Sequence, residues 1–206
     1  MLWNLKMKLK RLGNKSKTLN NKRNVLIVLS GPSGVGKGTI AKKLIEQNKN
    51  IALSISCTTR RPREGELNGR DYFFIEKSEF KNKVEQGGFL EYSEHFENFY
   101  GTPKQFVLNT LENKDVLLEI DVNGGLEVKK NFPDAVLIML LPPSLEEVRN
   151  RLIKRDTESL AKINLRMDRI DYELSKKELY DYNVVNDDLK TAIKEVEKII
   201  YQEKNK

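Results

Sequence analysis

The sequence predicts an α/β fold with a parallel sheet core that is flanked by helices. Short apolar runs alternate with segments of helical spacing, which is typical of a parallel sheet covered on both faces. A glycine-rich stretch separates the first apolar run from the first helical segment. Between residues 56 and 102 the pattern changes to short, aromatic-rich strands around one helix. This change indicates a small mixed α/β insert outside the core sheet.

The first half of the chain begins with a buried strand at 25–29 and a helix whose apolar residues recur at helical spacing. Residues 51–56 alternate small and apolar side chains and predict a second strand. In the insert, Asn68-Gly69 is a strong signal for a hairpin turn. A helix containing Phe80 and Val84 follows, and two short strands are predicted after it, at 89–92 and 99–102.

The second half of the chain returns to the core pattern. The same signals predict, in order, a helix at about 104–113, strands at 116–121 and 135–141, a helix from 145, a helix containing Arg166 and Arg169, a strand at 182–186 and a helix at 189–200. Ser144 and Glu147 fit a capping box, which indicates where the helix after the strand at 135–141 begins.

The net charge of +7 over 206 residues is concentrated in a basic extension at residues 1–23. This segment contains no acid, and without it the chain is close to neutral. We expect the extension to be disordered, because it is rich in Lys and Asn. The remaining basic residues suit small phosphate ligands better than a duplex, so no nucleic-acid partner is expected.

Two further features bound the class of protein. No apolar run approaches the ~20 residues of a membrane span, so no membrane association is expected. The single cysteine, Cys57, excludes an internal disulfide and favours a reducing compartment, which predicts a cytoplasmic protein.

The glycine-rich stretch has the form G-x-x-x-x-G-K and lies between a predicted strand and a predicted helix. Its residues are Gly31, Pro32, Ser33, Gly34, Val35, Gly36, Lys37, Gly38 and Thr39. Glycines let successive backbone N–H groups point into one concavity, and the N-terminus of the helix faces the same place. A turn that only joins the two elements would not need Lys37. The stretch therefore predicts a loop that binds the phosphates of a nucleoside triphosphate.

The loop departs from its commonest form at one position. Gly38 follows Lys37, where a Ser or Thr would usually offer its hydroxyl to magnesium, and the hydroxyl comes one place later at Thr39. We therefore expect no direct protein ligand for the metal, and a Mg²⁺ ion held mainly by phosphates and water.

Several motifs beyond this loop occur in one order along the chain. They are Ser56-Cys57-Thr58-Thr59-Arg60-x-x-Arg63, Glu66-x-Asn68-Gly69-x-Asp71-Tyr72, Phe89-x-Glu91-Tyr92, Tyr100-Gly101-Thr102, Glu119-Ile120-Asp121-Val122-x-Gly124, Arg151-x-x-x-Arg155 and Val184-Val185-Asn186-Asp187-Asp188. In order and spacing they resemble guanylate kinases over about residues 24–202.

The resemblance implies an enzyme of purine nucleotide metabolism and GMP recycling, which transfers the γ-phosphoryl group of ATP to GMP, and to dGMP as well. It implies a P-loop core, a GMP-binding insert, a helical lid and Mg²⁺ bound with ATP. These regions are expected at 24–55, 103–144 and 171–206 for the core, 56–102 for the insert and 145–170 for the lid. Monomer and homodimer are both compatible with the sequence.

The implied GMP site has a phosphate end and a base end. Arg60 and Arg63 can clasp the phosphate, with hydroxyl groups from Tyr72 and Tyr100. A carboxylate at Glu91 can accept both adjacent N–H donors of guanine, whereas adenine would leave it unpaired. By resemblance, the base end also includes Ser56, Thr102 and Asp121.

The implied catalytic groups are cations, because the transferring phosphoryl group spreads negative charge over its oxygens. They are Lys37, Arg60 and the lid residues Arg151, Arg155 and Arg166. Asn186 resembles a position near the adenine of ATP. Asp156 and Asn123 depart from the family pattern. The lone His95 has no catalytic context in the sequence, and a surface or strand role is expected for it.

Three other classes of protein share part of this sequence pattern. Guanylate-kinase-like modules that only bind proteins tend to lose the loop lysine, which is present here as Lys37. A GTPase is suggested by the D-x-x-G pattern at 121–124, but no N-K-x-D motif follows it. A kinase specific for adenylate would not be expected to carry Glu91 together with Tyr100-Gly101-Thr102.

Overall fold

The computed structural model describes residues 23–95, 97–154 and 160–206, without the side chains of 150–152, 154 and 160–166. In chain order its elements are β1 (Leu26–Ser30), α1 (Lys37–Gln47), β2 (Ile51–Leu53), β3 (Cys57–Thr58), β4 (Phe73–Phe74), α2 (Lys77–Glu85), β5 (Phe89–His95), β6 (Asn98–Pro103), α3 (Lys104–Leu111), β7 (Asp115–Glu119), α4 (Val122–Asn131), β8 (Val136–Leu141), α5 (Leu145–Lys154), α6 (Leu160–Leu174), the short 3₁₀ helix η2 (Lys177–Leu179), β9 (Tyr182–Val185) and α7 (Leu189–Lys204).

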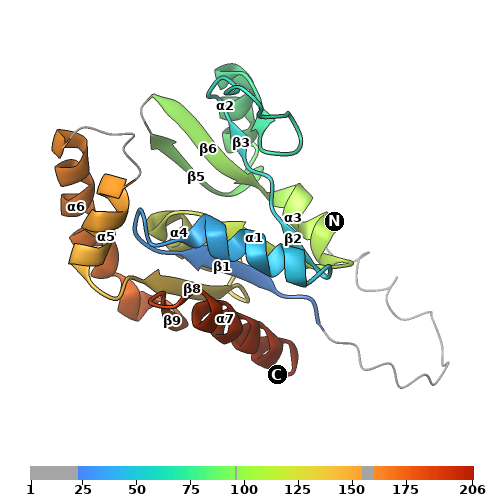
Figure 1. Cartoon of the computed structure of the whole chain (residues 1–206). Coiled ribbons are helices and arrows are strands. Elements are labelled where there is room, and N and C mark those ends of the chain that lie inside the picture. The colour runs from blue at the N-terminus through green and yellow to red at the C-terminus, as the bar shows by residue number, and fades with distance from the viewer. Residues whose placement is uncertain (1–22, 96, 155–159) are drawn as a thin grey trace, which may run out of the picture.

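The core is a five-stranded sheet in the order β2-β7-β1-β8-β9. Every neighbouring pair of these strands is parallel. The predicted fold class, a parallel sheet with helices on both sides, is therefore confirmed (Figure 1).

Alternation along the central strand β1 divides the core into two layers. Ile27 and Leu29 face α1 and α7 and join one apolar cluster, while Leu26 and Val28 face α3 and α4 and join another. All four side chains are almost completely buried. The central position of β1 fixes the loop that follows it at the carboxyl edge of the sheet.

A second sheet has the order β4-β3-β6-β5 and is mixed, because β3 and β4 are parallel while the other pairs are antiparallel. Phe80 of α2 packs under it against Cys57 and Phe89, with the rings of Phe80 and Phe89 stacked at 4.5 Å. Figure 1 shows this sheet with α2 above the core sheet. It gives the molecule a second wall that faces the loop after β1.

Two details differ from the sequence prediction. Asn68-Gly69 forms a turn, in which Gly69 has φ 77° and donates to the Tyr72 carbonyl at 2.8 Å, but no antiparallel hairpin surrounds it. The hairpin of this sheet joins β5 to β6 instead, with Glu97 at φ 64° in the turn. The helix α4 was not predicted, because Gly124 and Gly125 lower the helix propensity of its first turns.

Helices α5 and α6 pack together at one end of the core sheet (Figure 1). Val148 and Ile170 form their buried contact. One of the two hydrogen bonds of the predicted capping box is present, since the Ser144 hydroxyl accepts the backbone N–H of Glu147 at 3.1 Å. Within the described residues, no helix is both long enough and apolar enough to span a bilayer.

Candidate active site

The loop between β1 and α1 wraps around the position of Lys37. Gly31 and Gly36 have φ 146° and 101°, a backbone conformation that favours glycine, and a Cβ atom on Gly31 would lie 2.4 Å from the Leu140 carbonyl oxygen. The Lys37 ammonium donates to the carbonyl oxygens of Gly31 at 2.6 Å and Pro32 at 3.2 Å. The N-terminus of α1 and a held cation therefore face one small concavity.

Three carboxylates surround this lysine. Burial lowers the pKa of Lys37, and the charges of Glu173, Glu119 and Asp121 oppose that shift. Burial in turn raises the pKa values of Glu119 and Glu173, with Lys37 opposing both shifts. Acids that are themselves poorly solvated thus offset part of the effect that burial has on the pKa of the lysine.

The side chain of Glu119 explains why a glycine occupies position 38. A Cβ atom at Gly38 would lie 3.2 Å from Oε1 of Glu119, which is the last residue of β7. A serine here would press its side chain against that carboxylate. The glycine lets an acid from the neighbouring strand lie against the loop.

Arg60 and two tyrosines lie together beside the second sheet. The Arg60 guanidinium sits 5.5 Å from the centroid of the Tyr72 ring, and the rings of Tyr72 and Tyr100 lie 6.1 Å apart. Arg60 also donates to Oε1 of Glu66 at 2.9 Å, and this hydrogen bond is the main reason that its pKa is raised. The structure thus brings together three of the four residues predicted for the phosphate of GMP.

Glu66 organises the loop that carries the predicted arginine pair. While its Oε1 holds Arg60, its Oε2 accepts the backbone N–H of Arg63 at 2.7 Å. The Arg63 residue itself is exposed. Glu66 belongs to a sequence motif that by itself predicts no role for it. Its spacing of three and six residues from the two arginines was the available signal.

The predicted base-reading acid is deeply buried. Glu91 is 6% exposed, and its Oε1 accepts the hydroxyl of Thr102, on the paired strand β6, at 2.6 Å. Burial raises the pKa of Glu91 to about 7, the Thr102 bond opposes this, and the charge of Asp121 adds to it. A Cβ atom at Gly124 would lie 3.0 Å from Oε2 of Glu91, so α4 approaches this carboxylate closely.

Asp121 lies where three parts of the molecule meet. Its Oδ1 caps α4 by accepting the backbone N–H of Gly124 at 2.8 Å, which accounts for the D-x-x-G pattern. Its Oδ2 lies 3.1 Å from Nε2 of His95, on the second sheet, and 3.7 Å from a guanidinium nitrogen of Arg169, on α6. His95 is the last residue of β5, as its expected strand role has it, and this contact also links it to Asp121.

The other predicted residues lie as follows. The backbone carbonyl of Ser56 accepts the N–H of Phe73 beside β3, and its side chain is half-buried. The Asn186 amide donates to the Val35 carbonyl at 2.7 Å and so supports the loop after β1. Arg151 and Arg166 belong to α5 and α6, but their side chains, and all of Arg155 and Asp156, lie outside the described residues.

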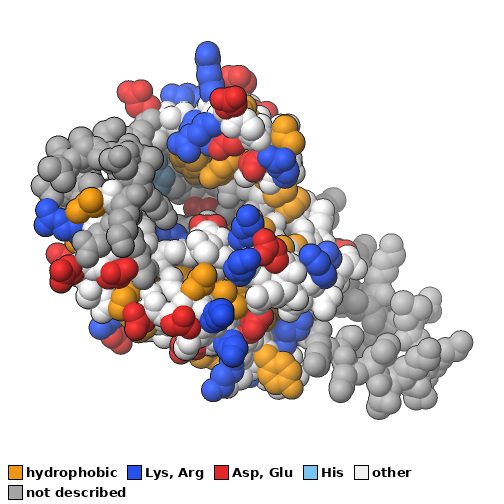
Figure 2. Space-filling view, viewed as in Figure 1, with side chains coloured by type: hydrophobic (Ala, Val, Ile, Leu, Met, Phe, Trp, Pro, Cys, Tyr) orange, Lys and Arg blue, Asp and Glu red, His pale blue; other side chains and the backbone are white. Residues whose placement is uncertain are grey.

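Four charged residues near the predicted site were given no role by the sequence, namely Glu66, Glu119, Arg169 and Glu173. Glu119 was detectable in principle, because it ends a buried strand directly before the predicted Asp121. Arg169 and Glu173 are one turn apart on α6, and only the packing of that helix brings them to Lys37. Figure 2 shows a hollow between the part built on the second sheet and the part built on the core sheet.

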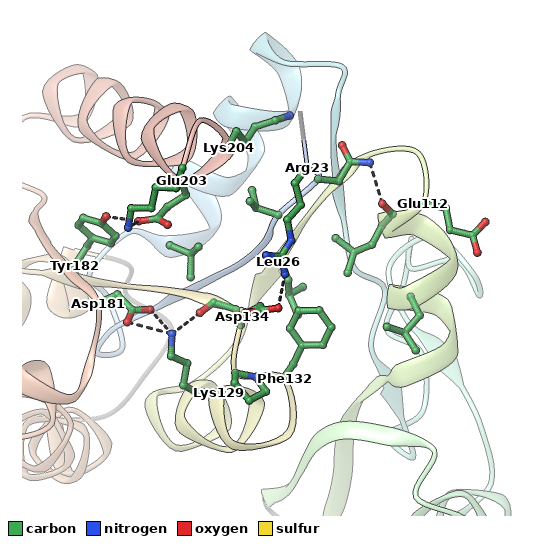
Figure 3. A pocket seen from close by; sticks show the side chains of 18 residues that line it. Arg23, Leu26, Glu112, Lys129, Phe132, Asp134, Asp181, Tyr182, Glu203 and Lys204 are labelled. Atoms are coloured by element: carbon green, nitrogen blue, oxygen red, sulfur yellow. Dashed lines mark hydrogen bonds and ion pairs between the residues drawn. The ribbon is translucent and has the colours of Figure 1, made fainter. Parts of the chain in front are cut away.

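A separate cavity of about 850 Å³ lies at the amino edge of the core sheet, lined by residues from the starts of β1, β8 and β9. Figure 3 shows two ion pairs among its charged side chains, Arg23 with Asp134 and Lys129 with Asp181. It lies across the sheet from the loop after β1, so we assign no nucleotide to it.

Comparison with known proteins identifies the family. Residues 23–203 match the family model described as guanylate kinase. A guanylate kinase of Caldanaerobacter subterraneus subsp. tengcongensis is 51% identical over 184 residues, which cover 89% of this chain and 89% of that protein. A guanylate kinase of Clostridioides difficile is 50% identical over 186 residues, covering 90% and 91% of the two chains.

A solved structure agrees with these sequence matches. The crystal structure of guanylate kinase from Anaplasma phagocytophilum superposes with a TM-score of 0.73 at 33% identity, covering 90% of this chain and 89% of that one. The order of strands, the loop around Lys37 and the buried acid on the second sheet all belong to the matched region. The chain belongs to the guanylate kinase family.

Proposed function

We propose two nucleotide sites that face each other, one for ATP at the loop after β1 and one for GMP on the second sheet. As a guanylate kinase, the chain transfers the γ-phosphoryl group of ATP to GMP, giving ADP and GDP. The observation that carries the GMP assignment is the pairing of a buried acid, Glu91, with Thr102 on the sheet that also carries Arg60. Purine recognition and phosphate binding would then occur on one surface.

The GMP site follows from the chemistry of its two ends. Arg60 and Arg63, with the hydroxyls of Tyr72 and Tyr100, would bind the phosphate dianion. On arrival the phosphate would replace Glu66 as the partner of Arg60. The carboxylate of Glu91 would accept N1–H and N2–H₂ of guanine, while the side chains of Ser56, Thr102 and Asp121 complete the base end. No residue is assigned to the ribose 2′-hydroxyl, so dGMP should also be accepted.

The ATP site would comprise residues 31–39, with Asn186 supporting the loop from behind. The regions of the chain then divide as the sequence predicts: a core at 24–55, 103–144 and 171–206, a GMP-binding insert at 56–102 and a lid at 145–170. In this division Arg151, Arg155 and Arg166 would reach the triphosphate from the lid. The enzyme would act in the cytoplasm, and monomer and homodimer both remain predictions.

The family works with a divalent metal bound to ATP, and we propose Mg²⁺. The residues present fit this ion, because the acids nearest Lys37 offer carboxylate oxygens, the donors that Mg²⁺ prefers. Asp121 and Glu119 would hold its water molecules, and the phosphates would supply its direct ligands. When bound, the ion would neutralise part of the phosphate charge.

Catalysis would then depend on position and on preformed positive charge. Lys37 would stabilise charge on the β- and γ-phosphates, and Arg60 would orient the attacking oxygen of GMP. The GMP phosphate is already a nucleophile, so no general base is needed. Enclosure of the two nucleotides between the second sheet and the lid would keep water from accepting the phosphoryl group.

A substitution of the buried acid tests the assignment. The variant Glu91→Ala should lower turnover of GMP by about 10³-fold or more, because the guanine donors would lose their acceptor. Its affinity for ATP, measured by equilibrium binding, should change by less than about threefold. Glu94→Ala, which removes an exposed acid from the same strand, is the matched control. Equal loss of GMP turnover and ATP affinity in Glu91→Ala would refute the base-reading role.

A further inference from the structure

Arg169 of α6 is a cation beside the loop that no role has yet been given. Its Nε donates to Oε1 of Glu173 at 3.0 Å, and a terminal nitrogen lies 3.7 Å from Oδ2 of Asp121. Its side chain is 49% exposed, while that of Glu173 is 8% exposed. A buried carboxylate therefore holds the Nε side of a guanidinium group that is half exposed to solvent.

The two acids that hold Arg169 also face the phosphate-binding loop. The charges of Glu173 and Asp121 both oppose the lowering of the Lys37 pKa by burial. Glu173 also accepts a hydrogen bond from the backbone N–H of Ser33. Among the described residues, Oε2 of Glu173 is buried and has no hydrogen-bond partner. A buried acid that is only partly hydrogen-bonded is costly, so Glu173 favours keeping the guanidinium of Arg169 beside it.

The guanidinium also lies at the junction between the two proposed nucleotide sites. Asp121 contacts Arg169 from α6 on one side and His95 from the second sheet on the other. The phosphoryl group must cross from the loop at Lys37 to the acceptor on that sheet. A cation held at the junction is placed where charge develops during transfer.

We propose that Arg169 is an additional catalytic cation, which leaves Asp121 and binds the transferring phosphoryl group when both nucleotides are present. The inference rests on the proposed function. During the step, the bond from the γ-phosphorus to the β-phosphate oxygen of ATP breaks and a bond to a phosphate oxygen of GMP forms. Arg169 donates N–H groups to the phosphoryl oxygens and exchanges no proton. Glu173 is a positioning residue, because it holds the Nε end of the guanidinium.

The competing explanation is an ordinary i,i+4 ion pair on a helix. Such a pair would stabilise α6 slightly and leave chemistry untouched. The two explanations differ in what they predict for a transition-state mimic, because only a catalytic cation binds that mimic more strongly than it binds the ground state.

The test compares Arg169→Gln and Arg169→Lys with Arg149→Gln, which removes the same charge from the exposed surface of α5. We expect kcat of Arg169→Gln to fall about 10- to 100-fold, less than for a sole cation because the lid arginines remain. The KM for GMP should match that of Arg149→Gln, whereas the melting temperature should fall further than in that control, because Gln leaves the buried Glu173 without its cation. Arg169→Lys should recover most of the lost kcat.

A binding measurement completes the test. With ADP, GMP, Mg²⁺ and aluminium fluoride as the mimic of the transferring group, Arg169→Gln should bind the assembly 10- to 100-fold more weakly, with unchanged affinity for ADP alone. Unchanged kcat and unchanged fluoride binding in Arg169→Gln would overturn the inference, as would losses that follow only a lower melting temperature. Absence of GMP turnover in the unaltered chain would instead contradict the proposed function itself.

Discussion

A single buried carboxylate decides how the proposed acceptor site responds to pH. Glu91 lies in a strand, shielded from water, and burial raises its pKa to about 7. Because the folded pKa lies above the ordinary value, the fold favours the protonated acid. This contribution to stability is complete at pH values below the ordinary pKa and is lost as the pH rises through about 7. Guanine, in contrast, needs the ionised form.

The pH dependence of GMP use follows from this conflict. The kcat/KM for GMP should fall about tenfold per pH unit below about 7, because protonated Glu91 cannot accept both guanine donors. The kcat/KM for ATP, measured at saturating GMP, should not show this decrease at pH values below about 7. An acid limb near 6, where a phosphate monoester takes up its second proton, would show instead that the GMP phosphate controls binding and that Glu91 titrates normally.

A second residue-scale prediction concerns the loop lysine. Lys37→Ala should lower kcat by several orders of magnitude, because it removes the cation that the loop after β1 holds. The affinity for GMP, measured without ATP, should change little. Lys42→Ala, on the exposed side of α1, should behave as the unaltered chain does. A large drop in GMP affinity for Lys37→Ala would contradict the separation of the two sites.

At the scale of elements, α4 is the instructive failure of sequence reasoning. Gly124 and Gly125 follow its N-cap, Asp121, and two consecutive glycines disfavour a helix. Tyr180 packs so close to the helix backbone that only glycine fits at position 125, since a Cβ atom there would lie 2.3 Å from the Tyr180 hydroxyl oxygen. That hydroxyl donates to the Val122 carbonyl at 2.9 Å in the core. Tertiary packing here overrides local propensity.

This packing predicts the result of a conservative change. Gly125→Ala should destabilise the protein by about 1–2 kcal/mol, because the clash with Tyr180 exceeds the gain in helix propensity. Denaturant unfolding would measure the loss, and Lys130→Ala on the exposed face of α4 is the control. Removal of the hydroxyl in Gly125→Ala/Tyr180→Phe should recover stability relative to the sum of the single changes. Strict additivity would show that the two residues do not meet.

Other elements were predictable because their signals are local. The apolar runs at β1, β7, β8 and β9 have no competing pattern, and each forms a strand of the core sheet within two residues of the predicted bounds. Asn68-Gly69 was misinterpreted because a turn signal specifies a local conformation and not which strands flank it. The sequence contains no signal that β5 and β6 form the hairpin of this sheet, which the structure shows.

At the scale of the whole molecule, the second sheet and α6 are brought against one edge of the core by contacts remote in sequence. Asp121 touches both, through His95 and Arg169, which are 26 residues before it and 48 residues after it in the chain. The motifs of the sequence were sufficient to nominate Arg60, Glu91 and Lys37. They could not reveal Glu173 beside Lys37, because only the packing of α6 brings that acid to the loop, where burial raises its pKa.

The central claim is that one cleft selects a guanine monophosphate and phosphorylates it from ATP. The most direct measurement is release of ADP from ATP and Mg²⁺ in a coupled assay, with GMP, AMP, CMP and UMP supplied side by side to the purified full chain. The account predicts that GMP is turned over at least about 10³-fold more efficiently than the other three. Comparable rates with AMP, or no ADP release with GMP, would contradict it.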